Sequence, residues 1–401
     1  MNPPLSGIRV LELNRVAPGA FCTMLLGDMG AEVLRIETPP RATAGKDMDA
    51  TRDDLWERSE FANRNKRSMT LNLKAPEAQR ILQRLAADAD VVVEGFRPGV
   101  AARLGADYAT LSEINPRLVY CSLSGFGQSG PYRDRAGHDL NYLALAGVLG
   151  QLGAPGAAPP IPLNLVADYA GASLHGVIGI LLALLARQTT GRGQHVDIAY
   201  LDTAFALLTA VPGIRNYLVG GTEPQRGENV FAGDHPYYAV YRTRDDRWLS
   251  VGCMEPWLWD NFCQAVGRPE LSAQRMHGSD FQQPPSAAQR AAKAELNALM
   301  RTRTLAEWEE VLAGADVCIG AVNGFAEAVA DPQLRHRHML LPLGDPRQPE
   351  ALQPGIAIKL GATPGTIRSL PARTGEHTTA VLHELGYPDA EIDALRAAGA
   401  V

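Results

Sequence analysis

One stretch near the start of the chain constrains the fold more than any other. Within about 30 residues its apolar pattern changes from that of a strand to that of a helix and back again. Residues 8–13 form a mostly apolar run typical of a strand, and Pro18 and Gly19 end it. Helical spacing of apolar residues follows over 20–29, and after Gly30 a second strand-like run covers 31–36. Strand, helix and strand at this spacing predict a βαβ unit, whose right-handed crossover makes the two strands parallel.

The same alternation continues to about residue 200. Further strand-like runs lie at 68–73, 91–95, 118–122 and 194–198, and helical spacing covers 76–87 and 167–187. Alternating strands and helices predict an α/β fold. We therefore expect a doubly wound, Rossmann-like large domain over residues 1–200.

The pattern changes after residue 225. Residues 236–243 and 248–252 predict a hairpin, and helical segments follow at 256–266, 287–300 and 305–312. We therefore expect a linker over 201–225 and a smaller α+β domain over 226–330. Residues 331–401 begin with many prolines and then carry an amphipathic helix at 376–385, so we expect this segment to pack back on the large domain.

Composition narrows the class of partner. The formal net charge is -6 and charged residues make up 20% of the chain, a balance that argues against nucleic acid as the main partner. The five cysteines are scattered and form no C-x-x-C pair, which indicates reduced thiols in a cytoplasmic protein. The longest apolar stretch, 177–186, is too short to cross a bilayer, so we expect a core helix and no membrane partner.

A glycine-rich turn follows the strand-like run at 118–122. Residues 125–130 match G-x-G-x-x-G, but a dinucleotide site needs a helix to open at that point. Pro131 and Tyr132 follow instead. The sequence thus favours a tight turn that carries backbone N–H groups over a nucleotide fingerprint.

His138 is the first candidate for chemistry. It lies between Gly137 and Asp139, just before a run with helical spacing, so we expect it near a helix N-terminus. The positive end of the helix dipole favours a neutral imidazole there, which suits a base. From spacing alone, a helix cap by Asp139 beside an exposed histidine is the better explanation.

Two acids are further candidates. Asp168 ends an apolar run and precedes the small residues 170–173, which would let a ligand approach the backbone closely. Taken alone, an N-cap explains Asp168 better. Glu255 follows the predicted strand at 248–252, where Pro256 favours a plain helix start.

Basic residues and histidines elsewhere allow two more interpretations. Arg97 lies in the segment 95–99 and Arg103 follows it, so the two either hold a phosphate-rich ligand through bidentate contacts or form a solvated basic face. His336 and His338 alternate with arginines, which repel a cation, so we expect no metal site.

Several sequence blocks around these candidates match a known pattern. The first 200 residues contain Leu-Ser-Gly-Ile-Arg-Val-Leu-Glu-Leu, Asn-Lys-Arg-Ser-Met-Thr-Leu-Asn-Leu-Lys, Glu-Gly-Phe-Arg-Pro-Gly and Ser-Gly-Phe-Gly-Gln-Ser-Gly-Pro. In these blocks the chain resembles the class III coenzyme A transferase superfamily, or CaiB/BaiF. Residues 136–335 contain Ala-Gly-His-Asp-Leu-Asn-Tyr, Pro-Leu-Asn-Leu-Val-Ala-Asp-Tyr-Ala-Gly and Trp-Leu-Ser-Val-Gly-Cys-Met-Glu-Pro. These are similar to its α-methylacyl-CoA racemase branch.

The resemblance implies a catalytic pair and a binding path. His138 and Asp168 would be the acid–base pair, and Glu255 an acid that approaches from the smaller domain. Coenzyme A would be part of the substrate, with no separate cofactor, and the family is typically an interlocked homodimer. The coenzyme A path would include Arg35, Leu71, Asn72, Leu73, Lys74, Gly95, Phe96, Arg97, Arg103, Gly137, Asp139, Leu140, Asn141 and Tyr142.

The chain departs from the pattern of that branch in two places. Thr38 stands where many relatives have a basic residue, so Arg35 or Arg41 is expected to contact a phosphate instead. Ala232 stands where an acid commonly shapes the active-site rim, and the residues at 234–235 are new. These changes bear on acyl specificity.

We therefore expect a racemase that moves the α-proton of a 2-methylacyl-CoA thioester through an enolate, with His138 and Asp168 on its two faces. The runner-up is a coenzyme A transferase in which Asp168 is a nucleophile, a reaction that needs no histidine at 138. A third interpretation is an acyl-CoA-binding protein without catalysis.

Overall fold

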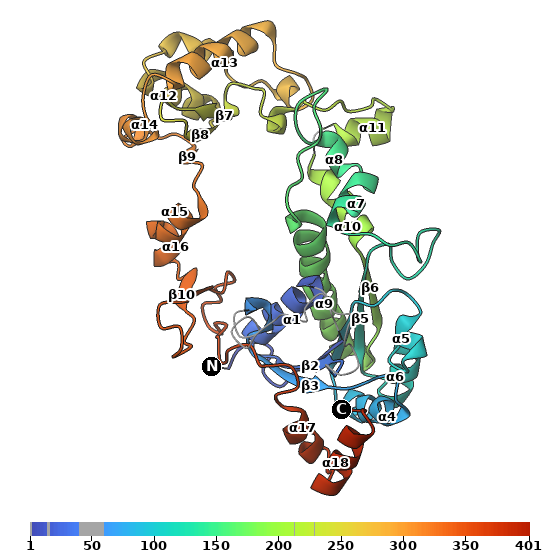
Figure 1. Ribbon diagram of the computed structural model, residues 1–401. Helices are drawn as coiled ribbons and strands as arrows, with labels where there is room; N and C mark the ends of the chain where they lie inside the picture. Colours follow the sequence, from blue (N-terminus) through green and yellow to red (C-terminus); the bar gives the residue numbers. More distant parts are fainter. Residues whose placement is uncertain (1, 14–16, 40–59, 212, 228) are drawn as a thin grey trace. The chain divides into compact units, whose positions relative to one another are not determined.

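The computed structural model describes all residues except 1, 14–16, 40–59, 212 and 228, which Figure 1 draws as a grey trace. The chain divides into two compact units. The first contains residues 1–143, 163–204 and 332–401, and the second contains 144–162 and 205–331. Residues 144–162, expected in the large domain, thus belong to the second unit.

Six parallel strands form the sheet of the first unit among the described residues, in the order β3-β2-β1-β4-β5-β6. Figure 1 labels β2, β3, β5 and β6 of this sheet. The α/β fold with a parallel sheet is confirmed. The strand order reverses between β1 and β4, and ligands of doubly wound sheets bind outside the carboxyl ends of the strands near such a point. The strands are β1 (Arg9–Leu13), β2 (Glu32–Glu37), β3 (Lys66–Thr70), β4 (Val91–Glu94), β5 (Val119–Ser124) and β6 (His195–Ala199).

Helices connect these strands. Helix α4 has the predicted bounds, because Pro76 at its first position has a preset φ angle and needs no N–H partner. The helices that begin in this unit are α1 (Ala17–Asp28), α4 (Pro76–Ala87), α5 (Val100–Arg103), α6 (Tyr108–Ile114), α7 (Asp139–Leu145), the π-helix η2 (Leu165–Ser173), α9 (Leu174–Thr190), α10 (Tyr200–Leu207), α16 (Pro332–His336), α17 (Thr378–Glu384) and α18 (Asp389–Ala397). Shorter elements are η1 (Phe61–Asn63) and the strand pair β10 (Leu340–Pro342) and β11 (Leu352–Pro354).

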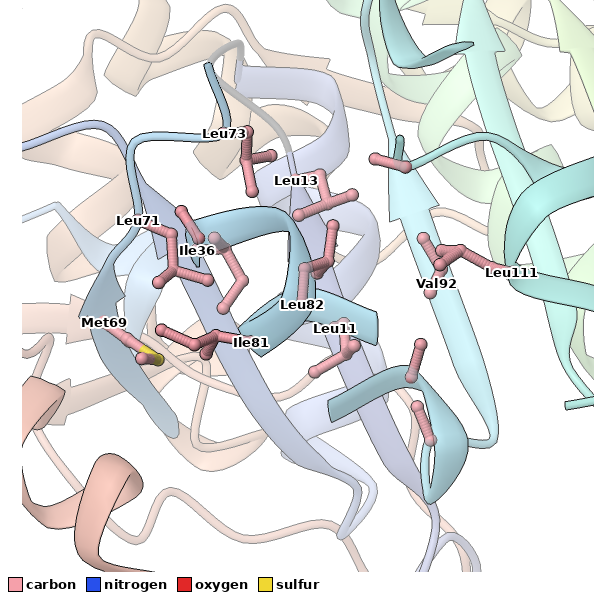
Figure 2. Close-up of a cluster of buried hydrophobic side chains, with 14 of the residues drawn as sticks. Leu11, Leu13, Ile36, Met69, Leu71, Leu73, Ile81, Leu82, Val92 and Leu111 are labelled. Carbon is pink, nitrogen blue, oxygen red and sulfur yellow. The ribbon is translucent and has the colours of Figure 1, made fainter. Parts of the chain in front are cut away.

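The core of the first unit includes side chains of the sheet and helix α4 (Figure 2). Leu11 and Leu13 of β1 share one buried cluster with Ile81 and Leu82 of α4. Leu382 of α17 joins the same cluster, so the end of the C-terminal segment packs on this unit. Burying one such side chain stabilises the fold by about 1.5–3 kcal/mol.

A buried ion pair explains why β3 begins before the strand predicted at 68–73. Lys66 Nζ donates to Glu12 Oε2 over 2.8 Å, and Thr23 Oγ1 donates to the same oxygen over 2.6 Å. All three side chains are buried, and burial lowers the pKa of Lys66. A lysine with such a partner can occupy a buried strand position that its charge alone would forbid.

The helix predicted over 167–187 is longer and more exposed than expected. Together η2 and α9 run from Leu165 to Thr190. The expectation of a core helix is wrong for one side of α9, which we call the exposed apolar face. The combined helix Leu165–Thr190 is the one described helix with the length and composition to cross a membrane, a property that core helices of soluble proteins share. The face consists of Leu174, Ile178, Leu181, Leu182 and Leu185, which are 41% to 61% exposed.

The second unit contains a three-stranded antiparallel sheet, and its first two strands confirm the predicted hairpin. Trp259, Phe262 and Trp308 are buried in its core. The strands are β7 (Tyr238–Arg242), β8 (Trp248–Gly252) and β9 (Ile319–Ala321). The helical elements are α8 (Val148–Gln151), η3 (Leu208–Ala210), α11 (Ile214–Gly220), η4 (Val230–Ala232), α12 (Pro256–Ala265), η5 (Pro269–Gln274), η6 (Gly278–Phe281), α13 (Ala287–Met300), α14 (Leu305–Leu312) and α15 (Phe325–Ala330).

Asp234 and His235, which depart from the pattern that the sequence resembles, both lie in this second unit. His235 is fully buried, its ring centroid lies 5.3 Å from that of Tyr237, and neither ring nitrogen has a hydrogen-bond partner in the part of the chain that is described. Asp234 Oδ1 pairs with Lys293 Nζ over 2.9 Å. Burial lowers the pKa of His235.

Candidate active site

The glycine-rich loop after β5 forms turns and opens no helix before Asp139, as predicted. Its first glycine makes room for an aromatic ring. A Cβ on Gly125 would lie 2.5 Å from Tyr142 Oη, and a Cβ on Gly137 would lie 2.7 Å from Tyr142 Cε1. The Tyr142 hydroxyl donates to Gly137 O over 2.5 Å, and burial raises the pKa of Tyr142 to about 12. The two glycines therefore hold the loop against the first turn of α7.

His138 lies directly before α7, so its predicted place at a helix N-terminus is confirmed. Its side chain is exposed. Asn141 Oδ1 accepts the N–H of His138 over 3.1 Å, and the N–H of Asn141 donates to His138 O over 2.8 Å. These two hydrogen bonds hold the backbone of His138 and leave its imidazole available to solvent or a ligand.

Asp139 connects the two segments that carry the predicted catalytic pair. Its carboxylate oxygen Oδ2 accepts the N–H of Ala167 over 2.8 Å and the N–H of Asp168 over 2.9 Å. Asp139 is 4% exposed, and its other oxygen, Oδ1, has no hydrogen-bond partner among the described residues. Since His138 precedes Asp139 in the chain, this contact brings His138 and Asp168 to one place.

Asp168 lies within the π-helix η2, so it is not the N-cap that its position alone suggests. Asn164 occupies the N-cap position and donates through Nδ2 to Asp168 Oδ2 over 3.4 Å. π-Helices are rare in proteins, and those that occur often lie at functional sites. The wider turn changes which residues share a face, which a period of 3.6 does not reveal.

The pKa of Asp168 is raised, chiefly because the carboxylate is partly buried. The negative charge of Asp139 raises it further, while the hydrogen bond from Asn164 and the positive charge of His138 oppose the shift. A carboxylic acid with a raised pKa can carry a proton closer to neutral pH than an exposed aspartate can. Together with an imidazole it forms a pair that can both accept and donate protons.

The small residues after Asp168 have a packing role. A Cβ on Gly171 would lie 2.8 Å from Thr203 Oγ1 and 3.1 Å from Val166 O. Ala172 is fully buried. At Gly171 and Ala172 the expectation of an open approach for a ligand is therefore wrong, because other parts of the chain already fill that space.

The expected coenzyme A path divides into residues near the predicted catalytic pair and residues with other contacts. Gly95, Phe96 and Arg97 follow β4, and the charge of Arg97 acts on Tyr142. Phe96 packs on the core, and its N–H donates to Glu94 Oε2 over 2.7 Å. Leu140, at 40% exposed, and Asn141 lie on the first turn of α7.

The remaining path residues are engaged elsewhere or point to solvent. Arg35 Nη2 pairs with Glu37 Oε2 over 2.7 Å and its side chain is 11% exposed, whereas Arg41 lies outside the described residues. Leu71 and Leu73 lie in the core that Figure 2 shows. Two others follow β3: Asn72 donates through Nδ2 to Gly399 O over 3.1 Å, and Lys74 is exposed.

Glu255 belongs to the second unit, at the N-cap position of α12 before Pro256. Its carboxylate makes no capping hydrogen bond and is exposed. The sequence correctly predicts that a helix starts before Pro256. This explains the backbone position of Glu255 but not the presence of a carboxylate there.

Sequence reasoning missed the link between the two segments that carry His138 and Asp168. Asp139 was recognisable as a helix-capping residue, but the N–H groups it binds belong to η2, 28 positions along the chain. Asn164 was missed as well, because the predicted helix began three residues too late to include it. The Asn164–Asp168 spacing of one turn is the signal that could have identified it.

Comparisons with known proteins show the family to which the chain belongs. A family described as CoA-transferase family III matches residues 5–378. α-Methylacyl-CoA racemase of Mus musculus is 35% identical over 390 residues, with 97% of this chain and 95% of the relative covered. The β subunit of succinyl-CoA–L-malate CoA-transferase of Chloroflexus aurantiacus is 36% identical over 404 residues, with 98% and 97% covered. A CaiB/BaiF family protein of Brucella suis has a crystal structure that matches with a TM-score of 0.78 at 30% identity, with 96% and 100% covered.

Proposed function

Because the chain belongs to CoA-transferase family III, whose members act on coenzyme A thioesters, we propose that it is an α-methylacyl-CoA racemase. It would interconvert (2R)- and (2S)-2-methylacyl-CoA. The observation that carries the proposal is the pairing of His138 with Asp168 through Asp139, whose Oδ2 accepts the N–H of Asp168 over 2.9 Å. Removing a proton from one face and returning it to the other requires two such groups.

In the proposed reaction one member of the pair removes the α-proton of the thioester. The C–H electron pair moves toward the carbonyl and forms an enolate, and the other member then donates a proton to the opposite face. His138 is the base for one enantiomer and Asp168 for the other. The raised pKa of Asp168 suits this dual role, because it increases the population of the protonated form that must donate a proton.

The developing enolate oxygen needs a hydrogen-bond donor. The N–H groups of Ala167 and Asp168 already bind Asp139 Oδ2, and that of His138 binds Asn141 Oδ1. The first N–H groups of a helix have no intrahelical acceptor, and Asp139 is the first residue of α7. The proposal therefore assigns the oxyanion to the N–H of Asp139.

The coenzyme A portion is proposed to lie along the turn after β4 and the start of α7. Arg97 and Arg103 would supply cations for its phosphates. Coenzyme A is part of the substrate, and the proton transfer needs no metal or redox cofactor. The role of Glu255 as a further acid is carried by the resemblance and by its uncommitted carboxylate.

A homodimer is also part of the proposal. The exposed apolar face of α9 is contiguous on one helix, and an apolar surface of this kind marks an interaction site more often than scattered exposed side chains do. We place the protein in the cytoplasm. Its five cysteines are all free thiols, which supports that placement.

The second candidate is a coenzyme A transferase, which the 36% identical Chloroflexus aurantiacus relative favours. In that reaction the Asp168 carboxylate would attack the thioester, form a mixed anhydride and release the coenzyme A thiolate. That step uses the Asp168 carboxylate alone and needs no histidine at position 138, whereas the contacts of Asp139 hold the segments of His138 and Asp168 together. The racemase therefore stands first.

Incubation with a panel of 2-methylacyl-CoA thioesters in D₂O separates these functions. A racemase incorporates deuterium at the α-carbon and changes its configuration without moving coenzyme A to another acid. Transfer of coenzyme A to added succinate, without deuterium incorporation, would instead establish the transferase. Binding without either reaction would establish a non-catalytic acyl-CoA-binding protein.

A further inference from the structure

The segment after β4 makes a tight turn that leaves one position without a side chain. The N–H of Val100 donates to Arg97 O over 3.0 Å, with Pro98 and Gly99 between them. Gly99 has φ 79° and ψ -8°. These features define a type II turn, which requires a positive φ at its third residue and favours proline at its second.

Two guanidinium groups face the empty side of Gly99. A Cβ at this glycine would lie 3.5 Å from Arg133 Nη2 and 3.8 Å from Arg103 Nη1. Arg103 ends helix α5 after β4, whereas Arg133 lies in the glycine-rich loop after β5. Strands β4 and β5 are neighbours in the sheet, so the two arginines approach one point from separate segments at its carboxyl edge.

The two positive charges are not neutralised where they meet. The Arg103 side chain has no hydrogen bond or ion pair with any residue that the structure describes. Arg133 donates through Nε to Gln128 O over 3.0 Å and through Nη1 to Asp134 Oδ1 over 3.4 Å. Asp134 has a side chain that is 78% exposed, so water screens its charge. The remaining nitrogen, Nη2, is the one that faces Gly99.

A hydrogen bond to the main chain fixes the position of the Arg133 side chain. Its acceptor, Gln128 O, belongs to a residue whose own N–H donates to Asp197 Oδ2 over 3.0 Å, at β6. A solvated basic face would leave long side chains free to separate. Here a main-chain anchor holds the Arg133 guanidinium near that of Arg103. The two positive charges repel each other unless an anion lies between them.

We propose that Arg133 and Arg103 form a clamp for a phosphate group of the coenzyme A portion of the substrate, over the bare backbone of Gly99. The proposal rests on the proposed function for the identity of the ligand. Two guanidinium groups can each offer paired N–H donors to the oxygens of one phosphate. The absence of a Cβ at Gly99 lets the phosphate approach the turn closely. Arg133 is not among the residues that the family resemblance assigns to the coenzyme A path.

The test compares two thioesters of the same 2-methylacyl group, one of coenzyme A and one of pantetheine, which lacks the nucleotide phosphates. In Arg133→Gln we expect KM for the coenzyme A thioester to rise about tenfold, as the loss of one charged hydrogen-bonding partner predicts. The ratio of kcat/KM between the coenzyme A and pantetheine thioesters should fall by the same factor. Arg133→Lys, which keeps the charge but not the paired donors, should lie between the two.

Arg135→Gln is the matched control, because Arg135 lies two positions away and stacks over the Tyr132 ring at 5.2 Å. It should leave the ratio unchanged. An unchanged ratio in Arg133→Gln, or an equal loss for both thioesters, would overturn the clamp. Titration calorimetry with coenzyme A alone keeps the two proposals apart. If the wild type binds coenzyme A without α-proton exchange and Arg133→Gln weakens that binding tenfold, the clamp stands and the racemase fails.

Discussion

The carboxylate of Asp139 accepts the backbone N–H of Asp168 over 2.9 Å, and this hydrogen bond joins the two segments of the candidate active site. Through it, the helix that begins beside His138 and the π-helix that carries Asp168 become one structural unit. The same carboxylate raises the pKa of Asp168 by its charge. Asp139 therefore positions the proposed catalytic acid and also raises its pKa.

Asp139→Asn should lower kcat for racemisation by about 10- to 100-fold, because Asp168 loses part of its anchor and a displacement of about 1 Å can cost that much. Removing the negative charge should also lower the pKa of Asp168. In the direction where Asp168 is the base, the rate falls as pH drops through that pKa. The acid limb of the pH–rate profile should therefore move to lower pH.

The shift of the acid limb separates a tuning role from a merely structural one. Asp134→Asn is a suitable control, because Asp134 is an exposed acid in the preceding loop. It should change neither kcat nor the position of the limb. A slower Asp139→Asn enzyme whose acid limb stays where it is in the wild type would limit Asp139 to holding the backbone.

His235 should make the second unit sensitive to acid. Burial lowers its pKa below the ordinary 6.5, so between these two values the unfolded chain binds more protons than the native one. The free energy of unfolding should therefore fall as pH drops below about 6.5. Asp280 and Asp234 oppose this shift and Lys293 reinforces it.

Urea unfolding followed by tryptophan fluorescence checks this prediction, since Trp259 and Trp308 are buried in the same unit. His235→Gln should flatten the pH dependence of the midpoint between pH 7 and pH 5. His383→Gln, at an exposed position, should retain it. Equal pH dependence in His235→Gln and the wild type would show that another group titrates.

Gly125→Ala should destabilise the first unit by about 1–3 kcal/mol, because the added methyl would overlap the Tyr142 ring in a packed region. The matched control is Gly361→Ala, since Gly361 lies in the same unit and a Cβ there meets nothing within 4 Å. Chemical denaturation gives both changes. Equal stability of the two variants would mean that the loop after β5 can move away from Tyr142 at little cost.

Local rules predicted much of the first unit. Helix α4 has its expected bounds because proline, apolar spacing and burial all agree there. The predicted strand at 68–73 was displaced because Lys66 is buried against Glu12, and strand prediction treats a lysine as exposed. Long-range pairs of this kind leave no periodic trace in the sequence.

The proposed catalytic pair illustrates the same limit. The position of His138 before a helix followed from spacing, but the π-helical turn around Asp168 and the contact with Asp139 depend on hydrogen bonds between segments 28 or more positions apart. Clamp residue Arg133 was passed over for a similar reason. Its partner, Arg103, is 30 positions earlier in the chain.

The most direct measurement of the central claim follows each enantiomer separately in D₂O with His138→Ala and Asp168→Asn. Both variants should lose racemisation by about 10²- to 10⁴-fold. Each should still exchange the α-proton of one enantiomer, the one whose face its remaining base contacts, and the two variants should retain opposite enantiomers. Racemisation at the wild-type rate in either variant, or retention of the same enantiomer by both, would contradict a two-base mechanism.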